Sequence, residues 1–270
     1  MLRTHVLPDG RRLHYDFRAG GPADAPVVAF LNGLSQTTVA WGLQAQRLRG
    51  KRCVLLHDAA GQGRSDAAAE GHRPAGHARD LLHLLDALGI ATVDAVGFSF
   101  GSRIALRLAL LAPERVRRLV LVGCAHRDTV VRRWIVSSWL EALAKGGREH
   151  AFRVVTPLVM GEAWLARNEK GAGEMLRAFV RRNTEEGMHR LLLDSLLPGG
   201  DLVEELRGIA RPALVVRGEE DLLVSRALSR ELTSLLPDAR LAECPGAGHT
   251  VAVEAPDWFA ATLAEFLGVS

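Results

Sequence analysis

The stretch from Thr92 to Ala112, TVDAVGFSFGSRIALRLALLA, constrains the fold of this chain more than any other. Its β-favouring start runs into GFSFG at 97–101, and apolar residues then recur with helical spacing at 104, 108 and 111. Pro113 is expected to stop that helix. A strand, a tight turn that holds a serine and a helix are the context that a G-x-S-x-G nucleophile elbow requires. Side chains at 97 and 101 would clash with such a turn, so both positions need glycine.

Strands and helices alternate on both sides of this stretch. Apolar runs predict buried strands at 27–31, 52–57, 118–122 and 213–217, and helical patterns lie between them. The predicted fold is therefore α/β, with a mostly parallel, doubly wound sheet and helices on both faces. Sites in such sheets lie at the carboxyl ends of the strands, where this chain has Asn32-Gly33, Asp58, Ser99 and Cys124. Residues 2–18 predict a hairpin that turns at Pro8-Asp9-Gly10.

The alternation stops between residues 126 and 208. This segment predicts only helices, at about 131–146, 147–160, 162–168, 172–188 and 189–197. We interpret it as an all-helical cap inserted into an α/β core that comprises residues 1–125 and 209–270. Most of its aromatic residues are expected to pack the helices, and a few are expected to line a pocket. The candidate substrate-binding residues are Asn32, Gly33, Trp134, Trp139, Met160 and Trp164.

A serine hydroxyl is a poor nucleophile unless a base, usually histidine, accepts its proton and an acidic group orients that base. Ser99, Asp221 and His249 occur in this order, each in a loop after a predicted strand, and this is the order that accompanies the elbow. They are the predicted catalytic residues. Glu219, Glu220 and Asp128 are weaker alternatives for the acid.

The tetrahedral intermediate of acyl transfer needs backbone donors for its oxyanion. Phe100, directly after the serine, is expected to supply one N–H group, and Leu34, after the 27–31 strand, the other. Gly33 allows the backbone to turn before Leu34.

Composition excludes several other classes of protein. The 34 basic residues are interleaved with 31 acidic ones, so a pI near 9.0 is no sign of nucleic-acid binding. Three widely spaced cysteines predict free thiols in a cytoplasmic protein rather than a disulfide framework. No Cys/His spacing suggests a metal, no cofactor is implied, and no apolar run approaches the roughly 20 residues of a membrane span.

Four segments together resemble the α/β-hydrolase superfamily over essentially the whole chain. They are GFSFG (97–101), DAAGQGRSD (58–66), RGEED (217–221) and GAGHTVAVEAP (246–256). The resemblance implies Ser99 as nucleophile, Asp221 as acid, His249 as base, Leu34 and Phe100 as oxyanion donors, and a helical cap. Most relatives have His-Gly where this chain has Asn32-Gly33. With Asn at this position the chain is similar to two subgroups, the enol-lactone hydrolases and the 3-hydroxyacyl transacylases. The corresponding loop of the transacylases resembles LNGLSQTTVAW (31–41).

Three functions are compatible with these residues. The first is a serine hydrolase that cleaves a small hydrophobic ester, thioester or lactone through an acyl-enzyme on Ser99. The second is an acyltransferase that uses the same acyl-enzyme with an acyl carrier as partner. The third is a ligand-binding or receptor protein on a hydrolase scaffold. Dehalogenation is disfavoured, because it uses a carboxylate nucleophile and position 99 is serine.

Overall fold

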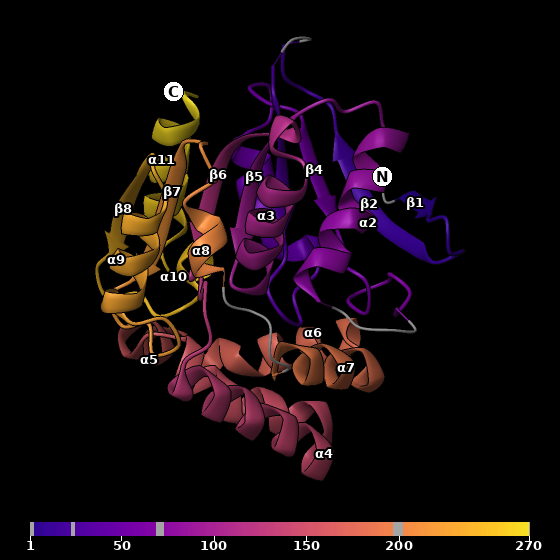
Figure 1. Cartoon of the computed structure of the whole chain (residues 1–270). Helices are drawn as coiled ribbons and strands as arrows, with labels where there is room; N and C mark the ends of the chain where they lie inside the picture. Colours follow the sequence, from indigo (N-terminus) through magenta and orange to yellow (C-terminus); the bar gives the residue numbers. More distant parts are fainter. Residues whose placement is uncertain (1–2, 23–24, 69–72, 197–201, 270) are drawn as a thin grey trace.

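The sheet at the centre of the molecule has eight strands in the order β1-β2-β4-β3-β5-β6-β7-β8 (Figure 1). The computed structural model describes residues 3–22, 25–68, 73–196 and 202–269. β2 pairs antiparallel with both β1 and β4, and all other neighbouring strands are parallel. This arrangement confirms the predicted α/β fold. The strands are β1 Arg3–Val6, β2 Arg12–Arg18, β3 Val27–Leu31, β4 Val54–His57, β5 Val93–Phe98, β6 Val116–Val122, β7 Ala213–Gly218 and β8 Ala239–Cys244.

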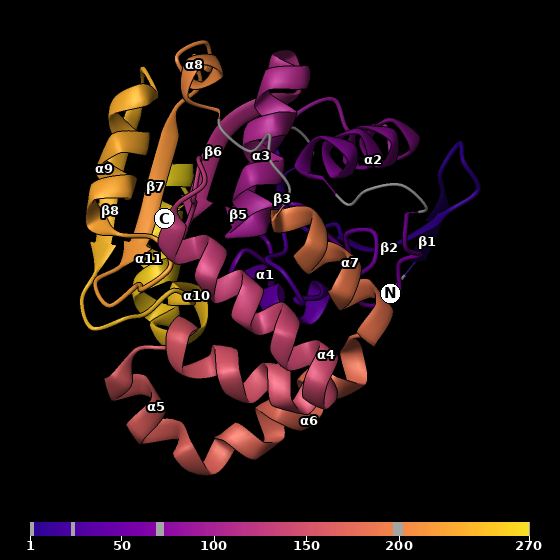
Figure 2. The same cartoon turned by 60° about the horizontal axis from the view of Figure 1, so that its bottom comes forward.

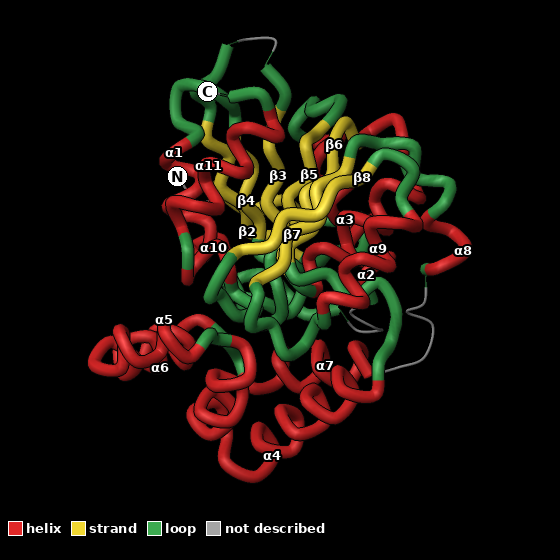
Figure 3. Tube along the Cα trace, turned by 90° about the vertical axis from the view of Figure 1, so that its left-hand side faces the viewer, coloured by secondary structure: helices red, strands yellow, loops and turns green. Residues whose placement is uncertain are grey.

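Helices cover both faces of the sheet, which is why its central strands are mostly apolar and buried. Figure 3 shows α2, α3, α8 and α9 on one side and α1, α10 and α11 on the other. The bounds are α1 Gly42–Arg47, α2 Pro74–Ala87, α3 Phe100–Leu111, α8 Val203–Leu206, α9 Arg226–Leu235, α10 Val251–Glu254 and α11 Pro256–Leu267, with short 3₁₀ turns at Thr38–Trp41 and Pro113–Arg115. Two apolar cores result, one on each face of the sheet.

Four helices between β6 and β7 form a separate layer at one end of the sheet (Figures 1 and 2). We call this layer, residues 130–196, the helical insertion. It consists of α4 Val130–Val159, α5 Glu162–Asn168, a 3₁₀ turn at Glu169–Gly171, α6 Ala172–Arg182 and α7 Glu185–Leu196. Apolar residues of α4 and α7, among them Val136, Leu143 and Met188, form a core of their own.

The helix boundaries of this region differ in part from those predicted. The expected break near residue 147 is present as a kink at Gly147, whose φ of 67° interrupts α4. The predicted helix at 172–188 is wrong as one element, because Asn183 has an extended backbone that separates α6 from α7. Residues 203–206 lie within the predicted cap segment, although no helix was predicted there; they form α8, which packs Leu206 into the core on the α3 face of the sheet. Residue 197, where the last predicted cap helix ends, lies outside the described residues.

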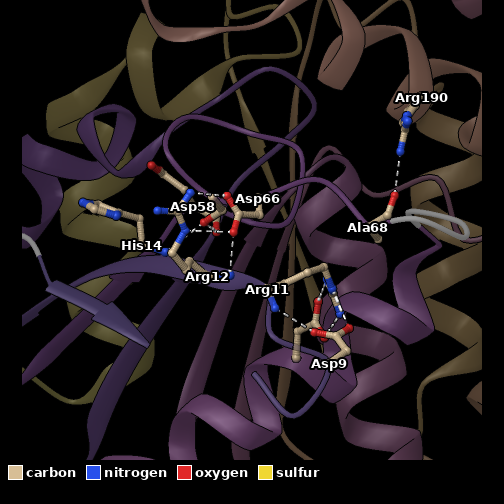
Figure 4. Close-up of polar contacts among 10 residues, drawn as sticks. Asp9, Arg11, Arg12, His14, Asp58, Asp66, Ala68 and Arg190 are labelled. Atoms are coloured by element: carbon tan, nitrogen blue, oxygen red, sulfur yellow. Dashed lines mark hydrogen bonds and ion pairs between the residues drawn. The ribbon is translucent and has the colours of Figure 1, made fainter. Parts of the chain in front are cut away.

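The N-terminal hairpin is attached to the rest of the fold by ion pairs (Figure 4). Arg11 forms two hydrogen bonds of 2.8 Å with the carboxylate of Asp80 in α2, and Arg12 pairs with Asp66. Figure 4 also shows Arg190 of α7, which donates to the carbonyl of Ala68 at 2.9 Å and so connects the helical insertion with the loop after β4. Among the described helices, none combines the length and apolarity needed to cross a membrane.

Candidate active site

Ser99 occupies a sharp turn between β5 and α3. Its backbone has φ 52° and ψ −112°, a conformation that residues other than glycine rarely adopt. The flanking glycines allow this turn, as expected: a Cβ at Gly97 would lie 2.4 Å from the carbonyl oxygen of Gly101, and one at Gly101 would lie 2.2 Å from that of Leu31. The side chain of Ser99 is consequently held at the carboxyl end of the sheet, at the start of α3.

His249 and Asp221 meet beside this turn although 27 residues separate them in sequence. Asp221 follows β7 and His249 follows β8, two neighbouring parallel strands. The Nδ1–H group of His249 donates to Oδ2 of Asp221 at 2.8 Å, and Oδ1 of Asp221 accepts the backbone N–H groups of Leu223 and Val224 at 2.8 and 2.9 Å. The acid is thereby fixed, and Nε2 of His249 has no hydrogen-bond partner among the described residues.

The other acids considered for this position are engaged elsewhere. Glu219 accepts the backbone N–H of Gly246, and Glu220 accepts that of Glu162 in the helical insertion. Asp128 forms an ion pair with Arg132. Geometry therefore favours Asp221 as the partner of His249.

Gly123, the first residue after β6, makes room for the imidazole. It has φ 56°, and a Cβ at this position would lie 2.7 Å from Cε1 and 2.9 Å from Nδ1 of His249. A glycine directly at a strand end could have indicated this residue, but the sequence analysis named the neighbouring Cys124 instead. Burial raises the pKa of the Cys124 thiol to about 12, and this side chain does not line the cavity described below.

A cavity of about 170 Å³ lies between the carboxyl end of the sheet and the helical insertion. Ser99 and His249 line it from the sheet domain. The opposite wall is mostly apolar and comes from the helical insertion: Ile135, Val136, Trp139, Phe152, Val155, Val159, Met160 and Phe179. Such a cavity suits the apolar part of a small organic substrate.

Of the six candidate substrate-binding residues, only Trp139 and Met160 are in the lining. Trp134 is 71% exposed, because the buried positions of α4 (132, 136, 139, 143) lie three or four apart and leave residue 134 on the opposite side. Trp164, on α5, is not among the lining residues either. The structure therefore places Trp134 and Trp164 outside the lining of this cavity.

Asn32 and Gly33 also lie outside the lining, for different reasons. The side chain of Asn32 is buried and donates to the carbonyl of His57 at 2.9 Å, which joins the ends of β3 and β4. Gly33 allows close packing, since a Cβ there would lie 2.6 Å from the ring of Phe98. Leu34 and Phe100, the expected oxyanion donors, do line the cavity, and neither backbone N–H donates a hydrogen bond to another described residue.

Glu254 is a residue near the site that the sequence analysis missed. Its carboxylate accepts the backbone N–H groups of Gly248 and Thr250, which flank His249, as well as that of Gly161 in the helical insertion, at 2.7 to 3.0 Å. The hydroxyl of Thr250 donates to the same carboxylate at 2.8 Å. One side chain thus connects the loop of His249 with the turn after α4, and only its place five residues after His249 could have indicated this.

Within the described part of the chain, no three His, Cys, Asp or Glu side chains are grouped so that they could hold a metal ion. The polar groups that line the cavity are hydroxyl, amide, imidazole and guanidinium groups. This set can perform proton transfer and nucleophilic attack through Ser99 and His249, with backbone N–H groups close by.

Comparison with known proteins supports the fold. Residues 26–256 match the sequence model of the family described as alpha/beta hydrolase fold. A protein of Caulobacter sp. (strain K31), provisionally named carbamate hydrolase RutD, is 31% identical, and the alignment covers 94% of this chain and 95% of that protein.

Two solved structures are also similar. The enol-lactonase from Burkholderia xenovorans LB400 superimposes with a TM-score of 0.86 at 27% identity, covering 98% of this chain and 100% of that chain. MGS-M2, an alpha/beta hydrolase enzyme from a Medee basin deep-sea metagenome library, has the same fold, with a TM-score of 0.91 at 24% identity over 99% of this chain and 98% of that chain. This chain belongs to the alpha/beta hydrolase fold family and is a hydrolase of that class.

Proposed function

We propose that this protein is a serine hydrolase that cleaves a carboxylic ester, thioester or lactone with an apolar acyl part. One observation carries the proposal: His249, hydrogen-bonded to Asp221 through Nδ1, lines the same cavity as Ser99 at its strained turn. In this arrangement Nδ1 is committed to the carboxylate, so Nε2 is the nitrogen left to accept a proton from Ser99.

The proposed reaction has two halves. Ser99 Oγ attacks the carbonyl carbon while Nε2 of His249 takes its proton, and the backbone N–H groups of Leu34 and Phe100 stabilise the oxyanion. Collapse of the tetrahedral intermediate breaks the bond to the leaving group, which receives the proton from His249. Water then attacks the acyl-enzyme with His249 again as base, and the carboxylic acid and free Ser99 result.

The relatives support substrates of this kind without defining one. The enol-lactonase is named for a lactone and RutD for a carbamate. The apolar wall formed by Trp139, Phe152 and Phe179 favours a substrate with hydrocarbon next to the carbonyl. Acyl transfer to an acceptor other than water stays an alternative prediction, and no contact of the described residues supports an acyl carrier as partner.

A fluorophosphonate probe followed by intact-mass measurement tests the proposed nucleophile. Wild type is expected to gain one adduct, and Ser99→Ala and His249→Ala are expected to gain none. Ser35→Ala is the matched control, because Ser35 is the other serine in the cavity lining and also has a positive φ of 62°. This variant should still be labelled. An adduct on Ser99→Ala, or a folded wild type that remains unlabelled, would contradict the proposal.

Hydrolysis and transfer are separated by the products. With a phenyl ester as substrate, added alcohol or thiol acceptors should leave the yield of free carboxylic acid nearly unchanged if water is the acceptor. A quantitative diversion of the acyl group to the added acceptor at low concentration would favour the transferase.

A further inference from the structure

Two arginines line the cavity that Ser99 and His249 share. Arg103 comes from α3 and Arg132 from the beginning of α4, and each is only 7% exposed. Among the described lining residues there is no Asp or Glu, and the other members are apolar, small or neutral polar groups besides His249. An organic molecule in this cavity therefore meets an apolar wall and two guanidinium groups.

The guanidinium of Arg132 is held in a defined position. Its Nη1 forms an ion pair with Asp128, and its Nη2 donates to the carbonyl of Ser195 in α7 at 2.7 Å. Burial, together with the nearby charge of Arg103, lowers the pKa of Arg132 to about 10. Two buried cations that line one cavity repel each other, so an anion bound beside both would be stabilised by both.

The position of Arg103 relates this charge to the reacting atoms. It lies in the first turn of α3, the helix that begins directly after Ser99, and both residues line the same cavity. A guanidinium carries five N–H donors and binds a carboxylate with two of them, so each arginine can keep its contacts within the protein and still bind a ligand.

We propose that Arg103 and Arg132 form an anion subsite that binds a carboxylate on the acyl part of the substrate. The substrate class is then the monoester or monothioester of a dicarboxylic acid, or a lactone that bears a carboxylate. Its methylene groups lie against the apolar wall, and its carbonyl carbon lies at Ser99. This inference rests on the proposed hydrolase function for the position of the carbonyl, and on the cavity alone for the binding of the anion.

A matched pair of esters tests the subsite. Monophenyl adipate and phenyl hexanoate have the same chain length and leaving group and differ in a terminal carboxylate or methyl group. Wild type is expected to have a kcat/KM about 10- to 100-fold higher for monophenyl adipate, the range that charge-assisted hydrogen bonds provide. In Arg103→Met this ratio should fall to about 1, and Arg103→Lys should restore part of it.

Arg107→Met is the control, because Arg107 lies on the same helix one turn further, outside the cavity, and pairs with Glu205. It removes the same charge and should keep the wild-type ratio. A wild type without preference for monophenyl adipate, or an equal loss of the ratio in Arg107→Met, would overturn the anion subsite while leaving the hydrolase proposal intact.

Binding without turnover distinguishes the two proposals and does not depend on the folding of the arginine variants. Calorimetry on Ser99→Ala should give at least about tenfold tighter binding of monophenyl adipate than of phenyl hexanoate. If monophenyl adipate is preferred although Ser99 cannot be labelled in wild type, the subsite stands and the serine hydrolase mechanism fails. If phenyl hexanoate binds as tightly as monophenyl adipate, the cavity selects only for hydrocarbon and the subsite is refuted.

Discussion

The imidazole of the proposed base lies beside Gly123, where a side chain would collide with it, and this packing allows a test. In Gly123→Ala, the new Cβ would lie 2.7 Å from Cε1 of His249. Ordinary carbon–carbon contacts are about 3.5 Å or longer, so the ring has to move by roughly 0.8 Å. Its 2.8 Å hydrogen bond to Asp221 cannot survive such a movement unless the acid follows, and Asp221 is fixed by two backbone N–H groups.

The expected magnitude has a backbone and a catalytic component. Alanine at a φ of 56° costs about 1 to 2 kcal/mol of the free energy of unfolding. Displacement of a catalytic group by nearly 1 Å is expected to lower kcat about 100-fold. The variant should therefore fold, unfold at a lower urea concentration and hydrolyse a phenyl ester at about 1% of the wild-type rate.

Gly89→Ala separates the two components. Gly89 follows α2, has φ 64° and has no atom within 4 Å of the Cβ that alanine would add. It should lose a similar free energy of unfolding, about 1 to 2 kcal/mol, and keep the wild-type kcat. The reasoning is refuted if Gly123→Ala loses stability like Gly89→Ala but retains full activity, because the position of His249 would then not matter for catalysis.

Three further variants test other parts of the structure. Glu254→Gln should lower kcat about tenfold, because an amide offers fewer acceptor sites to the N–H groups around His249; unchanged kinetics would contradict this. Burial lowers the pKa of His57 to about 4, below its value of 6.5 in the unfolded chain, so the unfolded state binds more protons between these values and stability falls as pH drops from 6.5 towards 4. Urea unfolding should show a flatter pH dependence for His57→Leu, and an equal slope would refute this origin. Asp94 is fully buried without a hydrogen-bond partner among the described residues, and burial raises its pKa. Its ionisation therefore destabilises the fold as pH rises above about 4. Asp94→Val should raise the free energy of unfolding at pH 7 by about 1 to 3 kcal/mol. A free energy of unfolding below that of wild type would contradict this and indicate that nearby arginines stabilise the carboxylate.

Local patterns in the chain were sufficient for the sheet and for the turn of Ser99. Apolar runs between helical patterns define buried parallel strands, and the glycines at 97 and 101 are required by backbone contacts within a few residues. Because parallel strands end at one edge of a sheet, the loops that hold Ser99, Asp221 and His249 could be expected to meet there.

The residues that complete the site depend on packing between distant segments. Trp134 and Trp139 lie five residues apart on the same helix, and only the packing of α4 decides which of them faces the cavity. Arg103 and Arg132 come from helices on opposite sides of that cavity, and Glu254 reaches a turn that lies 93 residues earlier in the chain. A periodic pattern shows that a helix has an apolar face, but it carries no information about which other segment covers that face. The fold and the turn that holds Ser99 were therefore decided by short-range sequence, whereas the shape and charge of the cavity were decided by how the helical insertion packs.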